Sequence, residues 1–262
     1  MRNRGQMDVP AVYGTGLVAL DVILRSKNGN PSVLTGGTCA NVLGILAYLG
    51  WRSHPICRIG DDTAAKLVLA DLRSLGMWLD LASVCPSART PIVVEYLTQD
   101  ENGNGKHRFS LRCPACNSWY PTYQPIPQRS LDRVLPQLKR PSLFFFDRPS
   151  RTALAMAKAA ADLGAVIAFE PAGAGDASLF SAALDLAHIV KYSHDRLGDT
   201  PMPFKTRSPF LVIETRGAEG LRYRSNLSGA SGRTWRCLKA FHIARVIDAA
   251  GCGDWLSATF LV

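Results

Sequence analysis

A run of small residues near the end of the chain, followed by an acid, has the residue types that phosphoryl transfer requires. Residues 248–254 read Asp-Ala-Ala-Gly-Cys-Gly-Asp, and an apolar, helix-like stretch follows. A turn of Gly and Ala lets backbone N–H groups converge on an anion, and the positive end of a helix dipole adds to this attraction. Asp254 stands at the rim of this turn, where a carboxylate can take the proton of an attacking hydroxyl.

A second segment of the chain has nearly the same letters. Residues 173–176 read Gly-Ala-Gly-Asp, and they too follow an apolar run and precede a helical pattern. Asp is favoured at the start of a helix simply because its carboxylate caps free backbone N–H groups. The spacing therefore leaves both readings open for Asp176 and for Asp254, and only features elsewhere in the chain distinguish the two.

Size and composition favour one globular α/β domain, alone or with a small appendage. The chain has 262 residues, of which 47% are hydrophobic, enough to bury a sizeable core. No apolar run reaches the roughly 18 to 20 residues of a membrane span, and the first ten residues lack the apolar region of a secretory signal. The seven cysteines are scattered and odd in number, which favours reduced thiols. We therefore expect a cytoplasmic protein without a membrane partner.

The formal net charge of +9 and the isoelectric point near 9.4 raise the question of nucleic acid. The basic residues are dispersed, and no helix-turn-helix, RNA-recognition or zinc-finger pattern is present. The excess charge indicates either a field that favours anionic ligands such as nucleotides or a solvated basic surface. Cys113 and Cys116 form a CxxC without a second ligand pair, so we expect no metal ligands from the protein and no nucleic-acid partner.

The elements that must position these residues follow an alternating pattern. A strand is expected over 12–24, a helix over 38–50, a strand over 55–59, a helix over 64–75 and a hairpin over 90–111. In the second half, strands at 143–146, 166–169, 189–191 and 210–214 alternate with helices at 151–163 and 177–186. This alternation is typical of parallel βαβ units, in which ligands bind beyond the C-terminal ends of the strands.

Several separated motifs occur in an order that resembles the ribokinase-like (PfkB) family of ATP-dependent sugar and nucleoside kinases, from about residue 12 to the end. Asp21 lies on an early strand. The motifs that follow it are Gly36-Gly37-Thr38-Cys39-Ala40-Asn41, similar to GGxxxN; Ile59-Gly60-Asp61-Asp62, similar to a G-x-D turn; Thr215-Arg216-Gly217-Ala218-Glu219-Gly220, similar to T-x-G-x-x-G; and Asp248 to Asp254, similar to D-x-x-[AG]-x-G-D. In the family the catalytic turn follows the T-x-G-x-x-G loop, which favours 248–254 over 173–176.

The resemblance implies a fold and an activity. The fold is a central, mostly parallel sheet flanked by helices, a single domain over 1–262 with a small β lid made by early strands and about 90–111. The activity is transfer of the ATP γ-phosphoryl group, with Mg²⁺ and with or without a monovalent cation, to a sugar or sugar acid. Both a monomer and a homodimer stay open.

The resemblance also assigns the site residues. Asp254 is the general base, and the backbone of Gly251, Cys252 and Gly253 stabilises charge on the transferring group. The acceptor side comprises Asp21, Gly37, Asn41 and Asp147, and the nucleotide side comprises Ser193, Thr215, Gly217, Gly220 and Asp248.

The chain also departs from the family pattern. Residues 193–196, Ser-His-Asp-Arg, stand where N-x-x-E is common, so that Arg196 replaces a glutamate, and Trp255 is bulky beside Asp254. The chain stops at Val262, inside the helix after the catalytic acid, so the C-terminal part of the family fold is expected to be missing. These departures keep an alternative open, a catalytically impaired relative that acts as a ligand-binding or interaction protein. A dinucleotide-dependent dehydrogenase is disfavoured, because no GxGxxG follows the first strand.

Overall fold

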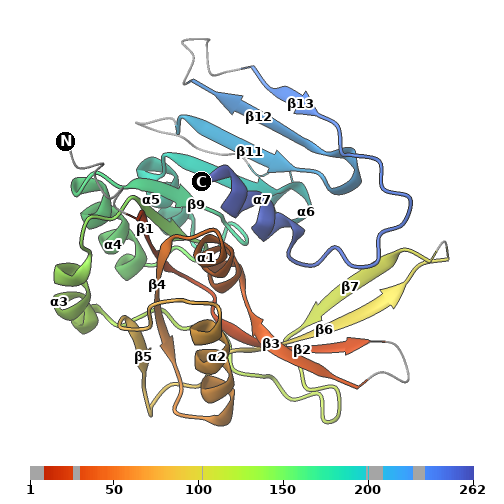
Figure 1. The fold of residues 1–262 in the computed structure, drawn as a ribbon, viewed down its shortest axis with the longest axis horizontal. Coiled ribbons are helices and arrows are strands. Elements are labelled where there is room, and N and C mark those ends of the chain that lie inside the picture. The colour runs from red at the N-terminus through yellow and green to blue at the C-terminus, as the bar shows by residue number, and fades with distance from the viewer. Residues whose placement is uncertain (1–8, 26–29, 102, 199, 201–208, 227–233) are drawn as a thin grey trace, which may run out of the picture.

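A nine-stranded, mostly parallel sheet and a separate four-stranded sheet organise the chain (Figure 1). The computed structural model describes residues 9–25, 30–101, 103–198, 200, 209–226 and 234–262. The large sheet has the strand order β13 (Arg236–Leu238), β12 (Leu221–Ser225), β11 (Leu211–Thr215), β10 (Ile189–Ser193), β9 (Val166–Phe169), β8 (Leu143–Phe146), β1 (Ala11–Thr15), β4 (Arg52–Ile59) and β5 (Ala82–Val84). Every pairing from β11 to β5 is parallel, and β12 and β13 extend one edge as antiparallel strands.

The smaller sheet has the strand order β3 (Ser32–Gly36), β2 (Ala19–Arg25), β6 (Ile92–Gln99) and β7 (Gly105–Ser110). The pair β6 and β7 is the hairpin expected over 90–111. The helices are α1 (Thr38–Tyr48), α2 (Thr63–Ser74), α3 (Leu131–Val134), α4 (Arg151–Asp162), α5 (Ala177–Leu186), α6 (His194–Leu197) and α7 (Cys252–Phe260). Short 3₁₀ turns lie at Gln128–Ser130, Leu135–Gln137 and Gly217–Glu219.

Helices cover both faces of the large sheet. Side chains along a strand alternate between the two faces, so successive residues of one strand pack into different clusters. Phe144 and Phe146 of β8 pack into a cluster with α4 and α5, whereas Phe145 packs into a second cluster with α1, α2 and α7. All three phenylalanines are buried, which explains why this strand reads as a continuous apolar run. The expected α/β architecture with a small additional sheet is therefore confirmed.

The expectation of one strand over 12–24 is wrong. The chain leaves the large sheet after Thr15 and enters the smaller sheet at Ala19, so two strands in different sheets share one apolar run. The break lies at Gly16, whose φ is 153° and where a Cβ would overlap the Asp147 carboxylate. A single glycine inside an apolar run carries this change of direction, and the apolar pattern conceals it.

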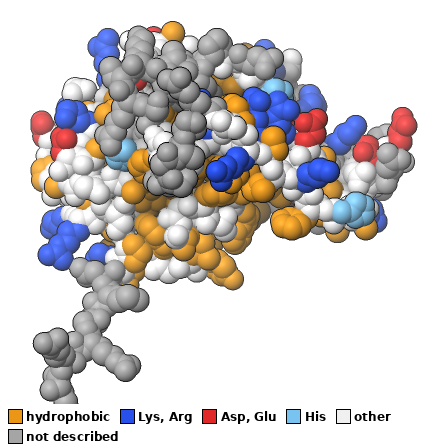
Figure 2. All heavy atoms as spheres, turned by 90° about the horizontal axis from the view of Figure 1, so that it is seen from above, with side chains coloured by type: hydrophobic (Ala, Val, Ile, Leu, Met, Phe, Trp, Pro, Cys, Tyr) orange, Lys and Arg blue, Asp and Glu red, His pale blue; other side chains and the backbone are white. Residues whose placement is uncertain are grey.

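The surface bears on partners. Figure 2 shows Lys and Arg side chains at several separate places on one face, without one continuous basic block on that face. None of the described helices is long and apolar enough to cross a membrane. In the part of the chain that the structure describes, the seven cysteines are free thiols.

Candidate active site

Asp254 and Asn41 meet although 213 positions separate them in the sequence. Asp254 lies in the first turn of α7, and Asn41 lies in the first turn of α1, which packs against α7. The Asn41 Nδ2 donates a hydrogen bond of 2.6 Å to Asp254 Oδ2. Gly251 begins α7 with a φ of 74°, a left-handed conformation that glycine adopts without strain.

The environment of Asp254 suits a proton acceptor. The pKa of Asp254 is raised to about 6, chiefly by burial and then by the charge of Glu170, while the Asn41 hydrogen bond and the cations Lys191 and Arg196 oppose this rise. A carboxylate with a pKa near 6 is ionised at neutral pH and still takes a proton readily. The turn at residues 251–253, which the sequence predicts to bind an anion, is called the anion turn below. One of its N–H groups already has a partner inside the protein, because the Cys252 N–H donates to the Ala249 carbonyl at 3.3 Å.

A buried ion pair contacts the anion turn through the Gly253 carbonyl. Lys191 of β10 and Glu170, which follows β9, form a salt bridge, and both are less than a tenth exposed. The Lys191 Nζ also donates to the Gly253 carbonyl at 3.1 Å, and the Ser257 hydroxyl contacts both Glu170 and the same carbonyl. The sequence analysis missed these residues, because their letters resemble ordinary strand and helix positions.

Asp21 carries a carboxylate oxygen without a partner among the described residues, and its carboxylate lies close enough to Asp254 to be affected by its charge. It lies on β2 against Gly36, where any Cβ would overlap its oxygens. Its Oδ1 is buried without a hydrogen-bond partner. Burial raises the pKa of Asp21 to about 7, and the charges of Glu95 and Asp254 add to the rise. Burial likewise raises the pKa of Glu95, a residue that the sequence analysis did not select.

Gly37 and Asp147 shape the acceptor side through the backbone. Gly37 precedes α1 with a φ of 96°, and a Cβ there would overlap the Leu17 carbonyl. Asp147 is fully buried at the end of β8, where its carboxylate accepts from the Leu17 N–H at 2.9 Å and from Arg148 at 2.8 Å. Burial raises the pKa of Asp147 to about 6, although Arg148 opposes the rise. Because both oxygens have partners inside the protein, Asp147 orients the crossing between the two sheets.

The predicted nucleotide loop begins where β11 ends. Thr215 closes the strand, Gly217 starts a 3₁₀ turn with a φ of 55°, and Gly220 has a φ of 99°. A Cβ at Gly220 would overlap the backbone of Leu238, so this glycine permits close approach of β13. The buried Glu214 accepts hydrogen bonds from Arg216 at 2.8 Å, from Arg222 and from Tyr192. The sequence analysis missed Glu214.

The remaining nucleotide-side residues lie at the edges of this region. Ser193 ends β10 and precedes α6 without a side-chain cap hydrogen bond. Arg196 lies exposed on α6, and its charge lowers the pKa of Asp254. Asp248 lies in the segment before α7, where its Oδ1 accepts from the Ala250 N–H at 2.8 Å.

Two other acids from the sequence motifs have structural partners. Asp176 caps α5, accepting from the N–H groups of Ser178 and Leu179 at 2.9 Å each. Asp62 caps α2 and also accepts from the Thr90 N–H and hydroxyl. Burial alone would raise the pKa of Asp62, but these hydrogen bonds hold it below its usual value. The Asp62 carboxylate thereby ties α2 to the start of the hairpin.

No protein-family model matches the chain, and no curated protein matches it in sequence. Solved structures do match. A microbiome-derived acarbose kinase is 21% identical with a TM-score of 0.74, over 97% of this chain and 85% of that one. Arabidopsis thaliana ribokinase, complexed with ribose and ATP, is 19% identical with a TM-score of 0.68, over 96% and 85%.

A third match is the nucleoside kinase of Burkholderia thailandensis in complex with inosine. It is 19% identical, with a TM-score of 0.66, over 96% of this chain and 82% of that one. The three matched proteins differ in their acceptors, so the likeness concerns the architecture. The chain has the ribokinase-like fold of these sugar and nucleoside kinases.

Proposed function

We propose that the protein transfers the γ-phosphoryl group of ATP to a hydroxyl of a sugar, with Asp254 as the general base. The observation that carries this proposal is the 2.6 Å hydrogen bond between Asn41 and Asp254, which joins the acceptor-side motif to the anion turn. The pKa of about 6 for Asp254 supports the role of a base near neutral pH. The fold of known sugar and nucleoside kinases supports the reaction class.

On the acceptor side, Asp21 and Asn41 hold the sugar hydroxyls. The unpartnered Oδ1 of Asp21 is free to accept from a hydroxyl, and Gly36 lets the Asp21 carboxylate lie directly against the backbone. Asp21 and Asp254 place two neighbouring carboxyl groups on this side, close enough that the charge of Asp254 raises the pKa of Asp21. Because an anionic acceptor would be repelled here, a neutral sugar fits this surface better than a sugar acid.

On the nucleotide side, the loop Thr215 to Gly220 and the start of α7 hold the phosphates. The positive end of α7 and the cations Lys191 and Arg196 act at Asp254, where the transferred group would lie. Magnesium would enter with ATP and neutralise phosphate charge. The residues 193–196 fit a magnesium ion poorly, because the positive charge of Arg196 lies next to Asp195.

The smaller sheet is the lid of this single domain. Asp21 lies on β2 and Glu95 on β6, so the sheet carries acceptor-side groups and covers the sugar. Closure of such an element excludes water and limits wasteful ATP hydrolysis.

A matched pair of variants tests the base. Asp254→Asn should preserve folding and lower turnover by about 10² to 10⁴-fold, the loss typical of removing a general base. Asp176→Asn, in the sequence of nearly identical letters, should leave turnover within about twofold, because Asp176 only caps α5. Turnover of Asp254→Asn close to that of the parent would rule out this assignment.

Calorimetry of sugar and ATP binding tests whether Asp21 and Asn41 act on the sugar and not on ATP. Asp21→Ala and Asn41→Ala should each weaken sugar binding, by an amount on the order of 0.5–1.5 kcal/mol per hydrogen bond lost, and leave ATP binding unchanged. A parent protein that binds a sugar without any transfer would instead favour a ligand-binding protein.

A further inference from the structure

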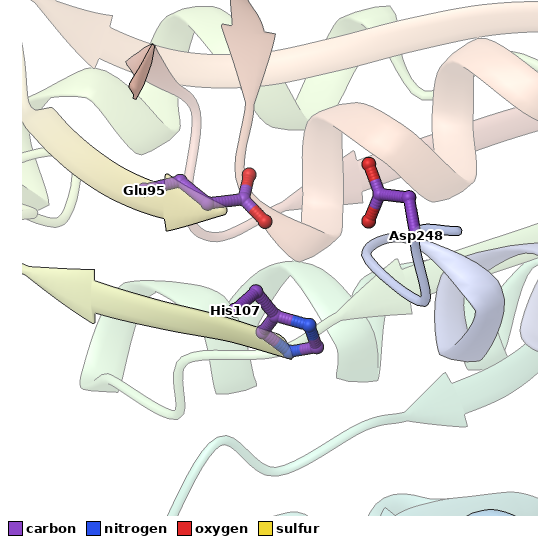
Figure 3. Close-up of side chains that lie close together, drawn as sticks. All are labelled: Glu95, His107 and Asp248. Carbon is purple, nitrogen blue, oxygen red and sulfur yellow. The ribbon is translucent and has the colours of Figure 1, made fainter. Parts of the chain in front are cut away.

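Three side chains that commonly bind metals converge from three segments (Figure 3). Glu95 comes from β6, His107 from β7 and Asp248 from the segment before α7. One ligand atom of each lies within 4.8 Å of the others. In the close-up, the two carboxylates and the imidazole ring surround a common space between the hairpin and the segment that carries Asp248.

The register of the hairpin brings Glu95 and His107 to one face. Glu95 is paired with Phe109, and His107 is paired with Leu97, two positions beyond Glu95. Residues two apart on a strand share a face, and diagonal neighbours on paired strands are within reach of long side chains. The two side chains therefore project from the same side of the smaller sheet.

Backbone hydrogen bonds fix the third residue beside this face. The Gly105 N–H donates to the Val246 carbonyl at 2.7 Å, and the Arg245 side chain adds a hydrogen bond from its Nε to the Gly103 carbonyl at 3.3 Å. A Cβ at Gly105 would overlap the Ile247 carbonyl, so the two segments are in direct backbone contact. Figure 1 shows the blue segment before α7 running beside the end of the yellow hairpin. Asp248 is thus held two residues from a backbone anchor.

Glu95 has a buried carboxylate oxygen that no described protein group satisfies. Its residue is 4% exposed, and its Oε1 is buried without a hydrogen-bond partner in the described structure. The other two side chains are exposed, so a cation from solvent can reach them, and a cation there would offset both the burial of the Glu95 oxygen and its repulsion by Asp248. The sequence analysis expected no protein metal ligands because the CxxC lacks a second ligand pair, and it did not consider these three residues, which lie far apart in the chain.

We propose that Glu95, His107 and Asp248 bind a divalent transition-metal ion that ties the smaller sheet to the segment before α7. Two carboxylates with one imidazole suit Zn²⁺, Co²⁺ or Mn²⁺, whereas Mg²⁺ and Ca²⁺ prefer oxygen ligands alone. Water would complete the coordination. The bound metal holds the hairpin against the segment that leads into Asp254. The site shares Glu95 and Asp248 with the region of the proposed phosphoryl transfer, but metal binding is measured without substrates, so its failure and the failure of the proposed function are distinguishable.

Titration with Co²⁺ tests the site on the full-length, chelator-treated protein. We expect one Co²⁺ per chain, with visible absorption bands and without the near-ultraviolet band of a thiolate ligand. Glu95→Gln and His107→Gln should each weaken binding by at least about 10 to 100-fold, the loss seen when even an outer partner of a metal ligand is removed. Hydrogen exchange should slow at both 105–110 and 245–248 on addition of Zn²⁺.

Three controls make the result decisive. Glu101→Gln removes an exposed acid of the same hairpin and His242→Gln an exposed imidazole, and both should bind Co²⁺ like the parent. Cys113→Ser removes the half-buried thiol of the CxxC and should also leave binding unchanged. Absence of binding in the parent, equal binding in Glu95→Gln, or a thiolate band lost in Cys113→Ser would each overturn the proposal.

Discussion

The buried ion pair beneath α7 gives a prediction whose size follows from the structure. Lys191 and Glu170 are 6% and 8% exposed, and the Lys191 Nζ bridges Glu170 and the Gly253 carbonyl. Lys191→Met leaves the Glu170 carboxylate buried without its cation, which costs about 3–5 kcal/mol in comparable sites. Removing both charges, in Glu170→Gln with Lys191→Met, avoids that penalty and should cost about 2 kcal/mol or less. The pair should therefore show strong coupling in a double-mutant cycle.

Urea unfolding, monitored by far-ultraviolet circular dichroism, measures these free energies of unfolding. The exposed pair Lys158 and Asp162 in α4 is the control, with a separation of 3.2 Å and side-chain exposures of 67% and 65%. Lys158→Met should cost less than about 0.5 kcal/mol. A loss below about 1 kcal/mol for Lys191→Met, or a double variant as unstable as the sum of both singles, would refute the reasoning.

Three further predictions concern Asp254, Asp62 and Gly220. First, kcat/KM for phosphoryl transfer should fall as the pH drops through about 6, because protonation of Asp254 removes the base; a pH–rate profile measures this limb. Second, Asp62→Ala should cost about 1–3 kcal/mol in urea unfolding at pH 7, through the lost cap and the lost link to the hairpin. Because the folded-state pKa of Asp62 is lowered, its contribution is present at neutral pH and disappears as the pH falls through that pKa, so parent and variant should converge in acid. Third, Gly220→Ala should lower the melting temperature, because φ is 99° and a Cβ meets the backbone of β13, whereas Gly173→Ala has open space and should not.

Local chemistry made much of the fold predictable. The apolar run at 143–146 and the helix patterns at 151–163 and 177–186 match β8, α4 and α5 to within a residue, because burial on both faces of a parallel sheet leaves a clear signal. The signal failed at Gly16, where the chain changes sheets without any change in hydrophobicity. The strands β12 and β13 at one end of the large sheet were missed for a different reason, since their polar letters resemble loops.

The site was predictable only where its residues belong to contiguous motifs. Asp254, Asn41 and the loop from Thr215 to Gly220 stand in short patterns that the sequence displays. Glu170 and Lys191 do not, because each is a single polar letter at the end or middle of an apolar strand. Their partnership depends on the neighbouring positions of β9 and β10 in the sheet, which no local pattern encodes.

The charges around Asp254 have a consequence for the proposed reaction. Asp21 lies on β2 of the smaller sheet, whereas the cations Lys191 of β10 and Arg196 of α6 lie on the side of the large sheet, where Glu170 is paired with Lys191. A γ-phosphoryl group would raise the pKa of a nearby carboxylate, because like charges disfavour ionisation. Cations on the nucleotide side counteract that rise and keep Asp254 ionised when both substrates are present. The acids on the acceptor side need no such compensation if the acceptor is neutral, which is a further reason to expect a neutral sugar.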